Sequence, residues 1–168
     1  QDISLKISRE MLQNNPVILK IKAGITNKIL NELKTLSNKE KDTYLKFWNN
    51  FGAVIKEGLY ELNDHHEKIL PLLRFETSES EIQTSLDDYI TKMKPDQNEI
   101  YYFANTDKDR IKNSPQLEAF TANKIPVLFM TDAVDEFWLQ NIKNFKDKEF
   151  KSISKGKVDI SKLKKDDK

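Results

Sequence analysis

The spacing of apolar residues changes at residue 74, and this change constrains the fold more than any other feature of the sequence. Before it, apolar residues recur every three or four positions, which predicts helices that each bury one face. A first helix begins at Pro16, a second runs from about Lys39, and a third, short helix spans about Asn63 to Leu73. The apolar positions are Ile18, Ile21, Ile25, Ile29, Leu33 and Leu36 in the first helix and Tyr44, Phe47, Trp48, Phe51 and Ile55 in the second. Helices joined by short connections pack together, so residues 16–73 are expected to form a three-helix coil.

Beyond residue 74, helices alternate with short strands. Residues 74–85 are rich in Ser, Thr and Glu and are predicted to be a linker. The expected strands are "EIYYFAN", "IPVLFM" and "KEFKSIS", and the expected helices cover 86–93, 107–112, 115–123 and 133–142, the first capped by Ser85. The sequence therefore predicts an α/β (α+β) fold, in which a small α/β sandwich with a short, mainly parallel sheet covers residues 86–155. Residues 156–168 are predicted to be a polar C-terminal tail.

Composition argues against several classes of partner and site. The 168 residues carry a formal charge of only +1, so neither nucleic acid nor an anionic membrane is expected as the main partner. The lysine-rich C-terminal stretch is interpreted as a solvated strand and tail, with a nucleic-acid patch as the alternative. The absence of cysteine excludes disulfides, thiolate metal sites and cysteine nucleophiles. No apolar run approaches the roughly 20 residues that span a bilayer. Because the chain starts at Gln1 within a strand-like alternation, we expect it to be part of a longer protein.

No group of residues in the sequence forms a self-contained active site. The four glycines are scattered, so the sequence has no Gly-rich phosphate loop. His65 and His66 are adjacent, and neighbours on a helix point in different directions, so no metal site is expected there. The aromatic stripe of the second helix is explained by core packing, with an aromatic binding surface as the alternative. A stand-alone enzyme is therefore the least favoured interpretation.

The segment "KISREMLQNNP" places an arginine between a strand-like alternation and a helix. In one interpretation, Ser8 caps a short helix and Arg9 is solvated or pairs with an acid. In the other, the guanidinium of Arg9 reaches a phosphate bidentately, and Gln13, four residues later on the same helical face, adds an amide. Because the chain has no phosphate loop, the nucleotide would then lie on another domain, and Arg9 would stabilise charge during phosphoryl transfer.

Several long stretches occur in the order and spacing of one known family. They are "ISREMLQ", "KFWNNFGAVIKEGLYE", "LLRFETSES", "TSLDDYITKMKPDQNEIYYF", "SPQLEAF" and "VLFMTDAVDEF". On these stretches, from Ser4 to about Ile153, the chain resembles the middle segment of the ninety-kilodalton heat-shock protein chaperones, closest to the bacterial HtpG type. The sequence departs from the family in "NFKDKEF", which lacks a glycine often found in this turn, and "QDISLK" is less similar to the family than the residues after it.

This resemblance implies an architecture, a cofactor and partners. Members of the family are homodimers with an N-terminal ATP-binding domain, a middle domain and a C-terminal dimerisation domain. The middle domain has a large α/β part, a three-helix coil and a smaller α/β part, so residues 1–15 would be the end of the large part and would hold the catalytic loop. In that loop, Arg9 would contact the γ-phosphate of ATP when the N-terminal domain docks, and Gln13 would support the docked state.

The same resemblance sets limits on what this chain does alone. ATP, with Mg²⁺, would be bound mainly by the N-terminal domain, which this chain lacks, so no cofactor is expected in the fragment itself. The parent would be an ATPase chaperone, whereas the fragment alone would not be an enzyme. The bacterial type and the absence of a signal peptide also imply a cytoplasmic protein.

The helix over 133–142 is the expected client-binding element. The family commonly shows Asp-Glu and an aromatic there, and this chain has Asp135, Glu136 and Phe137, followed by Trp138. An aromatic that is partly exposed beside acids could contact unfolded or partly folded clients, so Glu136, Phe137 and Trp138 are the candidate residues. Alternatively, Phe137 or Trp138 packs the helix onto the sheet. Adjacent helical residues cannot both face the core, so at least one is expected to be partly exposed.

Two functions remain open on the sequence. In the first, the chain supplies Arg9 to ATP held by the N-terminal domain and helps to bind clients. In the second, it is a non-catalytic interaction module for clients or co-chaperones, and Arg9 is only structural.

Overall fold

Two long helices form the first half of the chain in the computed structural model, which describes residues 15–61, 65–161 and 163. They are α2 (Pro16–Lys39) and α3 (Lys41–Glu61), and the short α4 (His66–Ile69) and the 3-10 turn η2 (Leu70–Leu72) come after them. The Asn15 side chain accepts a hydrogen bond from the backbone N–H of Val17, and Pro16 occupies the first turn, so α2 begins where its sequence favours a start. None of the described helices is both long and apolar enough to cross a membrane.

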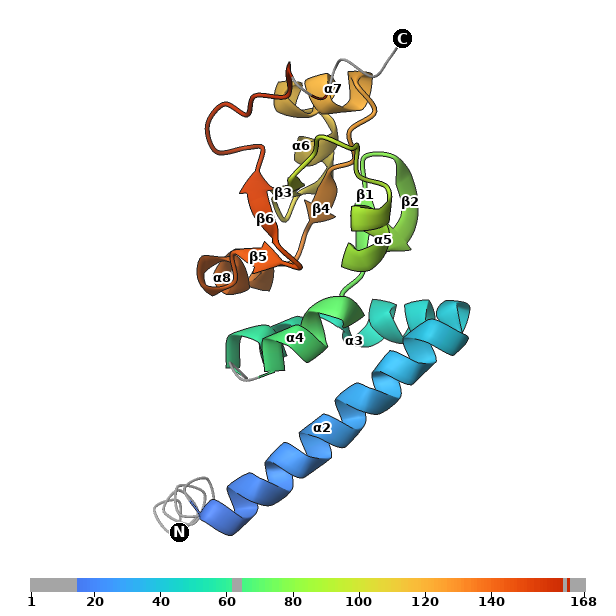
Figure 1. The fold of residues 1–168 in the computed structure, drawn as a ribbon, viewed down its shortest axis with the longest axis vertical. Coiled ribbons are helices and arrows are strands. Elements are labelled where there is room, and N and C mark those ends of the chain that lie inside the picture. The colour runs from blue at the N-terminus through green and yellow to red at the C-terminus, as the bar shows by residue number, and fades with distance from the viewer. Residues whose placement is uncertain (1–14, 62–64, 162, 164–168) are drawn as a thin grey trace.

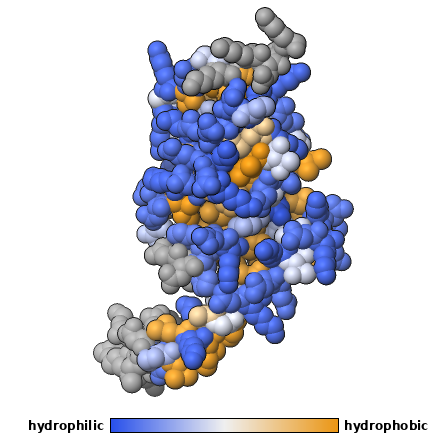
Figure 2. Space-filling model, viewed as in Figure 1, coloured by the Kyte–Doolittle hydropathy of each residue, from blue (hydrophilic) through white to orange (hydrophobic). Residues whose placement is uncertain are grey.

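The first half of α2 projects away from the rest of the molecule (Figure 1). Among the described residues, α2 packs its apolar side chains against neighbouring elements through Leu30, Leu33 and Leu36. Val17, Ile18, Leu19, Ile21, Ile25 and Ile29, which come before Leu30, are exposed. Figure 2 shows this apolar surface as an orange region at the lower end of the molecule. The helical periodicity of α2 is therefore confirmed, but of its predicted buried face the described part of the chain covers only Leu33 and Leu36.

A six-stranded sheet forms the second half, with strand order β2-β1-β4-β3-β6-β5. Its strands are β1 (Phe75–Thr77), β2 (Ser80–Thr84), β3 (Glu99–Ala104), β4 (Leu128–Met130), β5 (Asn144–Phe145) and β6 (Lys148–Ser152). The helices between them are α5 (Leu86–Thr91), α6 (Lys108–Lys112), α7 (Pro115–Ala122) and α8 (Val134–Asn141). The central strand β3 is parallel to β4 and β6, whereas the outer pairings are antiparallel. The α/β class is confirmed, but the sheet is mixed, and the predicted parallel arrangement holds only for its three central strands.

Residues 74–85 contain a β-hairpin, so their interpretation as a linker is wrong. β1 pairs with β2 and also with β4, which makes the hairpin an edge of the sheet. β2 has no apolar alternation because it is an edge strand with an exposed first half, so only a polar, turn-rich composition is visible in the sequence. The helical coil is thus joined directly to the sheet through Phe75.

The two faces of the sheet carry two separate cores. On β3, Ile100 packs into one core and Tyr101 into the other, as expected when side chains alternate along a strand. The first core lies against α3, α4, α5 and α8, and the second lies against α6 and α7. The second core also buries Ile160 and Leu163. The segment predicted to be a polar tail therefore contributes apolar side chains to the fold, spaced three residues apart between lysines and acids.

Two glycines should respond in opposite ways to substitution by alanine. A β-carbon on Gly24 would have no atom within 4 Å, whereas one on Gly52 would lie 2.7 Å from the Trp48 ring. Gly24→Ala should therefore raise the free energy of unfolding by about 0.5–1 kcal/mol, because alanine favours the helix. Gly52→Ala should lower it by about 1–3 kcal/mol, because it overpacks Trp48. Urea denaturation of the two variants checks this, and shifts in the same direction would contradict it.

Alkaline unfolding should accompany the ionisation of the buried tyrosines. Burial raises the pKa of Tyr44 to about 12 and that of Tyr101 to about 12, and it raises the pKa of Tyr89 and of Tyr102 as well. Because the folded-state pKa exceeds that of the unfolded chain, this stability is complete below about pH 10 and is lost as the pH rises through the folded value. Tyrosinate absorbance and circular dichroism should change together. Full ionisation near pH 10 with an unchanged fold would contradict this.

Candidate functional site

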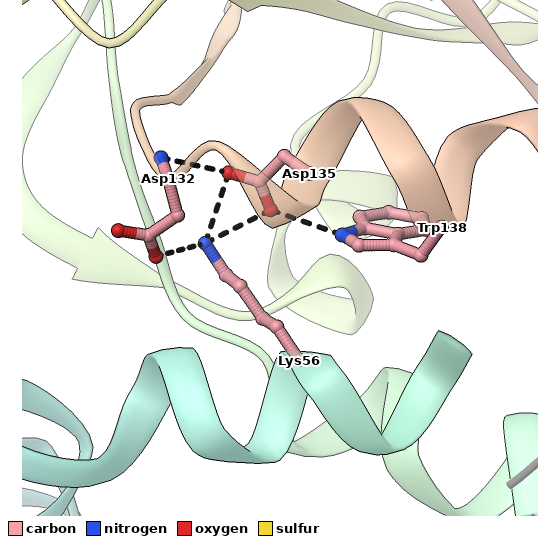
Figure 3. Close-up of polar contacts among 4 residues, drawn as sticks. All are labelled: Lys56, Asp132, Asp135 and Trp138. Carbon is pink, nitrogen blue, oxygen red and sulfur yellow. Dashed lines mark hydrogen bonds and ion pairs between the residues drawn. The ribbon is translucent and has the colours of Figure 1, made fainter. Parts of the chain in front are cut away.

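A buried lysine joins α3 to the start of α8 (Figure 3). The ammonium of Lys56 lies 2.8 Å from Oδ2 of Asp132 and 3.0 Å from Oδ1 of Asp135. The indole N–H of Trp138 donates to Asp135 at 2.9 Å, and the backbone N–H of Asp132 donates to the same carboxylate at 3.1 Å. Lys56 also stands 4.9 Å from the centre of the Phe75 ring. The Lys56 ammonium and the Asp135 carboxylate therefore both have several partners inside the protein.

The environment of Asp135 makes this arrangement sensitive to the loss of Lys56. Burial raises the pKa of the Asp135 carboxyl above its usual value, and the positive charge of Lys56 opposes that shift. The Asp135 side chain has no exposed surface, so its charge depends on protein partners rather than on water. The network is therefore structural, because it fixes the orientation of α8 against α3. That orientation decides which side chains of α8 face outward.

The three predicted client-binding residues lie on different faces of α8. Trp138 is fully buried and packs edge-on against Phe150, with ring centres 5.5 Å apart. Phe137 is 54% exposed, and Glu136 is exposed beside it. The expectation that one of the two aromatics is exposed is thus confirmed for Phe137. Trp138 cannot contact a client in this structure because it is a core residue, so we withdraw it from the candidate set.

Phe137 has an aromatic neighbour on another helix. The ring centres of Phe137 and Tyr60 are 6.3 Å apart and the rings meet at 68°, an edge-to-face geometry. Tyr60 belongs to the last turn of α3 and is 55% exposed. The two rings support one another and still present about half of their surfaces to solvent. They form the aromatic pair Tyr60–Phe137.

A polar cleft lies between α3 and the hairpin, and its cations already have partners. Lys56 is held by the two aspartates, and Lys108 pairs with Glu76 at 2.5 Å. Arg74 donates to the carbonyl oxygens of Pro71 and Leu73 and lies over the Tyr44 ring. The charges lining this cleft are therefore used in holding the coil, the hairpin and β4 together.

The predicted phosphate-contacting residues, Arg9 and Gln13, lie outside the described residues, so their roles stay predictions. Within the described part of the chain, no group of three or more His, Cys, Asp or Glu side chains could hold a metal ion. His66 is close to the Leu59 carbonyl oxygen, at 2.9 Å from Nε2, which ties α4 to the end of α3.

Sequence reasoning missed Lys56 and Tyr60. The buried positions of α3 are Tyr44, Trp48, Gly52, Lys56 and Leu59. A lysine within an apolar stripe at helical spacing was the signal for a buried cation with an acidic partner. Tyr60 gave no such signal, because its contact with Phe137 depends on how α8 packs against α3.

Comparisons with known sequences point to one protein family. The family model described as Hsp90 protein matches residues 1–168. The chaperone protein HtpG of Roseobacter denitrificans is 48% identical over 163 residues, and that of Methylorubrum populi is 46% identical over 165 residues. Each alignment covers 97% of this chain and 26% of the relative, so the chain spans about a quarter of the length of the curated relatives it matches.

One solved structure supports the same assignment at the level of the fold. It is the middle domain of a Plasmodium falciparum protein described as a heat shock protein. Its TM-score is 0.75 at 33% sequence identity, over 85% of this chain and 61% of that one.

Proposed function

The chain belongs to the Hsp90 protein family, and from that premise we propose that it works as the middle segment of an ATP-dependent chaperone. In this proposal it supplies Arg9 to ATP bound, with Mg²⁺, on an N-terminal domain of the same protein, and it helps to bind client proteins. Gln13 supports the segment that carries Arg9. Residues 1–15 end the large middle subdomain, 16–73 form the coil, and the small α/β subdomain comes next. The parent acts as a cytoplasmic homodimer.

The observation that carries the client-binding part is the exposure of Phe137. An aromatic side chain on a regular helix normally buries its ring against the core, as Trp138 does one residue later. Phe137 instead shows more than half of its surface and has the carboxylate of Glu136 next to it. Exposed aromatics on rigid elements are typical of interface hot spots. Glu136 and Phe137 are therefore the proposed client-contact residues.

The alternative function is a non-catalytic interaction module for clients or co-chaperones. The same exposed Phe137 favours it, because client contact does not require Arg9. The two proposals differ only in the effect of Arg9 on ATP turnover. They agree on what Phe137 does.

Truncation of Phe137 should weaken client binding by the full-length protein about five- to thirtyfold, a change of about 1–2 kcal/mol. The reason is the loss of an apolar anchor that is exposed before binding and buried after it. The measurement is the anisotropy of a labelled, permanently unfolded protein titrated with wild type and with Phe137→Ala.

A matched control separates this effect from a general loss of apolar surface. Ile82 is 75% exposed on β2, so Ile82→Ala removes a more exposed apolar side chain from a different face. Client affinity should be unchanged in Ile82→Ala, and both variants should keep their helix content. Equal affinity of Phe137→Ala and wild type would remove Phe137 from the client site.

A further inference from the structure

Tyr60 on α3 and Phe137 on α8 form one exposed aromatic surface that spans two helices. Its ring meets the edge of Phe137 across the boundary between α3 and α8. The two helices are joined by the buried Lys56–Asp135 ion pair, in which Lys56 lies one helical turn before Tyr60 and Asp135 lies two residues before Phe137. The two rings are therefore presented on elements whose relative position is fixed, and little side-chain ordering is needed on binding.

Acidic side chains border this aromatic pair. Glu57 precedes Tyr60 by one turn on the same helical face, Glu61 follows it, and Glu136 precedes Phe137; all three are exposed. Neither the last turn of α3 nor that of α8 carries a basic residue. The nearest lysine on α3 is Lys56, whose charge is buried and paired. Two lysines do lie near Glu136: Lys143 and Lys155 line a small polar cavity together with Glu136 and Gln140. The acidic border is therefore clearest at Glu57 and Glu61.

Gln140 adds a hydrogen-bonding group beside the rings. It is exposed, lies three residues after Phe137 and also lines the cavity with Glu136, so it stands between Phe137 and that cavity. A side-chain amide can both donate to and accept from the backbone of an extended peptide. The combination of two rings, an amide and the carboxylates of Glu57 and Glu61 suits a segment with an apolar anchor and positively charged neighbours.

We propose that Tyr60 and Phe137 together bind extended, unfolded polypeptide segments in which an apolar side chain is flanked by lysine or arginine. This inference rests on the proposed client-binding function and names the class of segment that the site selects. The apolar anchor covers both rings, and the flanking cations face Glu57 and Glu61. The carboxylates contribute selectivity and association rate more than affinity, as rim charges usually do.

The test uses the full-length protein and two labelled peptides of the same apolar core, one flanked by lysines and one by glutamates. The lysine-flanked peptide should bind more tightly, and its advantage should shrink as salt is raised. Tyr60→Ala and Phe137→Ala should each weaken its binding about five- to thirtyfold. The double variant should lose less than the product of the two effects, because the rings act as one contact.

Two further variants test whether the Tyr60 hydroxyl is needed and whether the effect is specific to this face of α3. Tyr60→Phe keeps the ring and should bind like wild type. Phe51→Ala removes a ring that is 50% exposed on the same helix, nine residues before Tyr60 and thus on the opposite face. It should leave binding unchanged. Circular dichroism and thermal melts of each variant report whether the fold is retained.

Each of the other possible outcomes would overturn a specific part of this proposal. If Phe137→Ala weakens binding and Tyr60→Ala does not, the two-helix surface is wrong and the proposed client site at Phe137 stands. If neither variant weakens binding, both are wrong. If Phe51→Ala weakens binding as much as Tyr60→Ala, binding is to apolar surface in general and the inference fails. Equal affinity for the two peptides overturns the selectivity for basic segments.

Discussion

Replacement of Lys56 by methionine should lower the free energy of unfolding by about 3–5 kcal/mol. Methionine preserves much of the length and apolar stem of lysine but removes the ammonium. Asp135, which has no exposed surface, then remains buried with only the indole and backbone N–H groups as partners. An uncompensated buried charge costs far more than a lost surface ion pair. Urea denaturation should show a lower midpoint with an unchanged slope.

The pH dependence of this loss identifies its cause. Without Lys56, the hydrogen bond from Trp138 still lowers the pKa of Asp135, but the larger opposing effect of the lysine charge is gone, so its folded-state pKa moves further above the usual 3.8. A raised folded-state pKa means that stability is retained below the unfolded value and lost as the pH rises through the folded value. The destabilisation by Lys56→Met should therefore be smallest in acid and grow toward neutral pH.

Two variants complete this test. Lys46→Met changes an exposed lysine on the same helix and should alter stability by less than about 0.5 kcal/mol. Asp135→Asn in the Lys56→Met background removes the stranded charge and should restore part of the lost stability. A loss below about 1 kcal/mol for Lys56→Met, or one that is constant with pH, would show that the network is not a structural link.

Local signals in the sequence predicted the helices well. Pro16 and Ser85 stand at helix starts, as predicted. These starts could be predicted because the effects of a proline or a capping serine on the backbone depend on only a few neighbouring residues. The period of apolar residues likewise predicted α3, since each turn of that helix repeats the same burial. The strand β3 was equally visible, because its side chains alternate between two buried cores.

Features that depend on distant parts of the chain could not be predicted. The hairpin β1–β2 is polar because β2 lies at an edge, and nothing in its own residues shows that β1 pairs with β4. The choice between Phe137 and Trp138 was open because it depends on the rotation of α8. That rotation is set by Lys56, which is 79 residues before Asp135 in the sequence. The contact of Tyr60 with Phe137 results from the same packing.

Replacement of Arg9 by alanine in the full-length protein should lower ATP turnover roughly ten- to a thousandfold, the range for one contact to a developing oxyanion. The contact would exist only when the N-terminal domain docks, so kcat should fall more than ATP affinity. Arg9→Lys keeps the charge but loses the planar bidentate geometry, so it should retain only part of the activity. Lys6→Ala removes a cation three residues earlier and should leave turnover unchanged.

Steady-state ATP hydrolysis by the wild-type and Arg9→Ala full-length proteins, with ATP affinity measured on the same preparations, tests the proposed function most directly. We expect turnover to collapse in Arg9→Ala while ATP still binds with near wild-type affinity. Unchanged turnover would contradict the catalytic role of this segment and would leave the chain as a binding module for clients or co-chaperones.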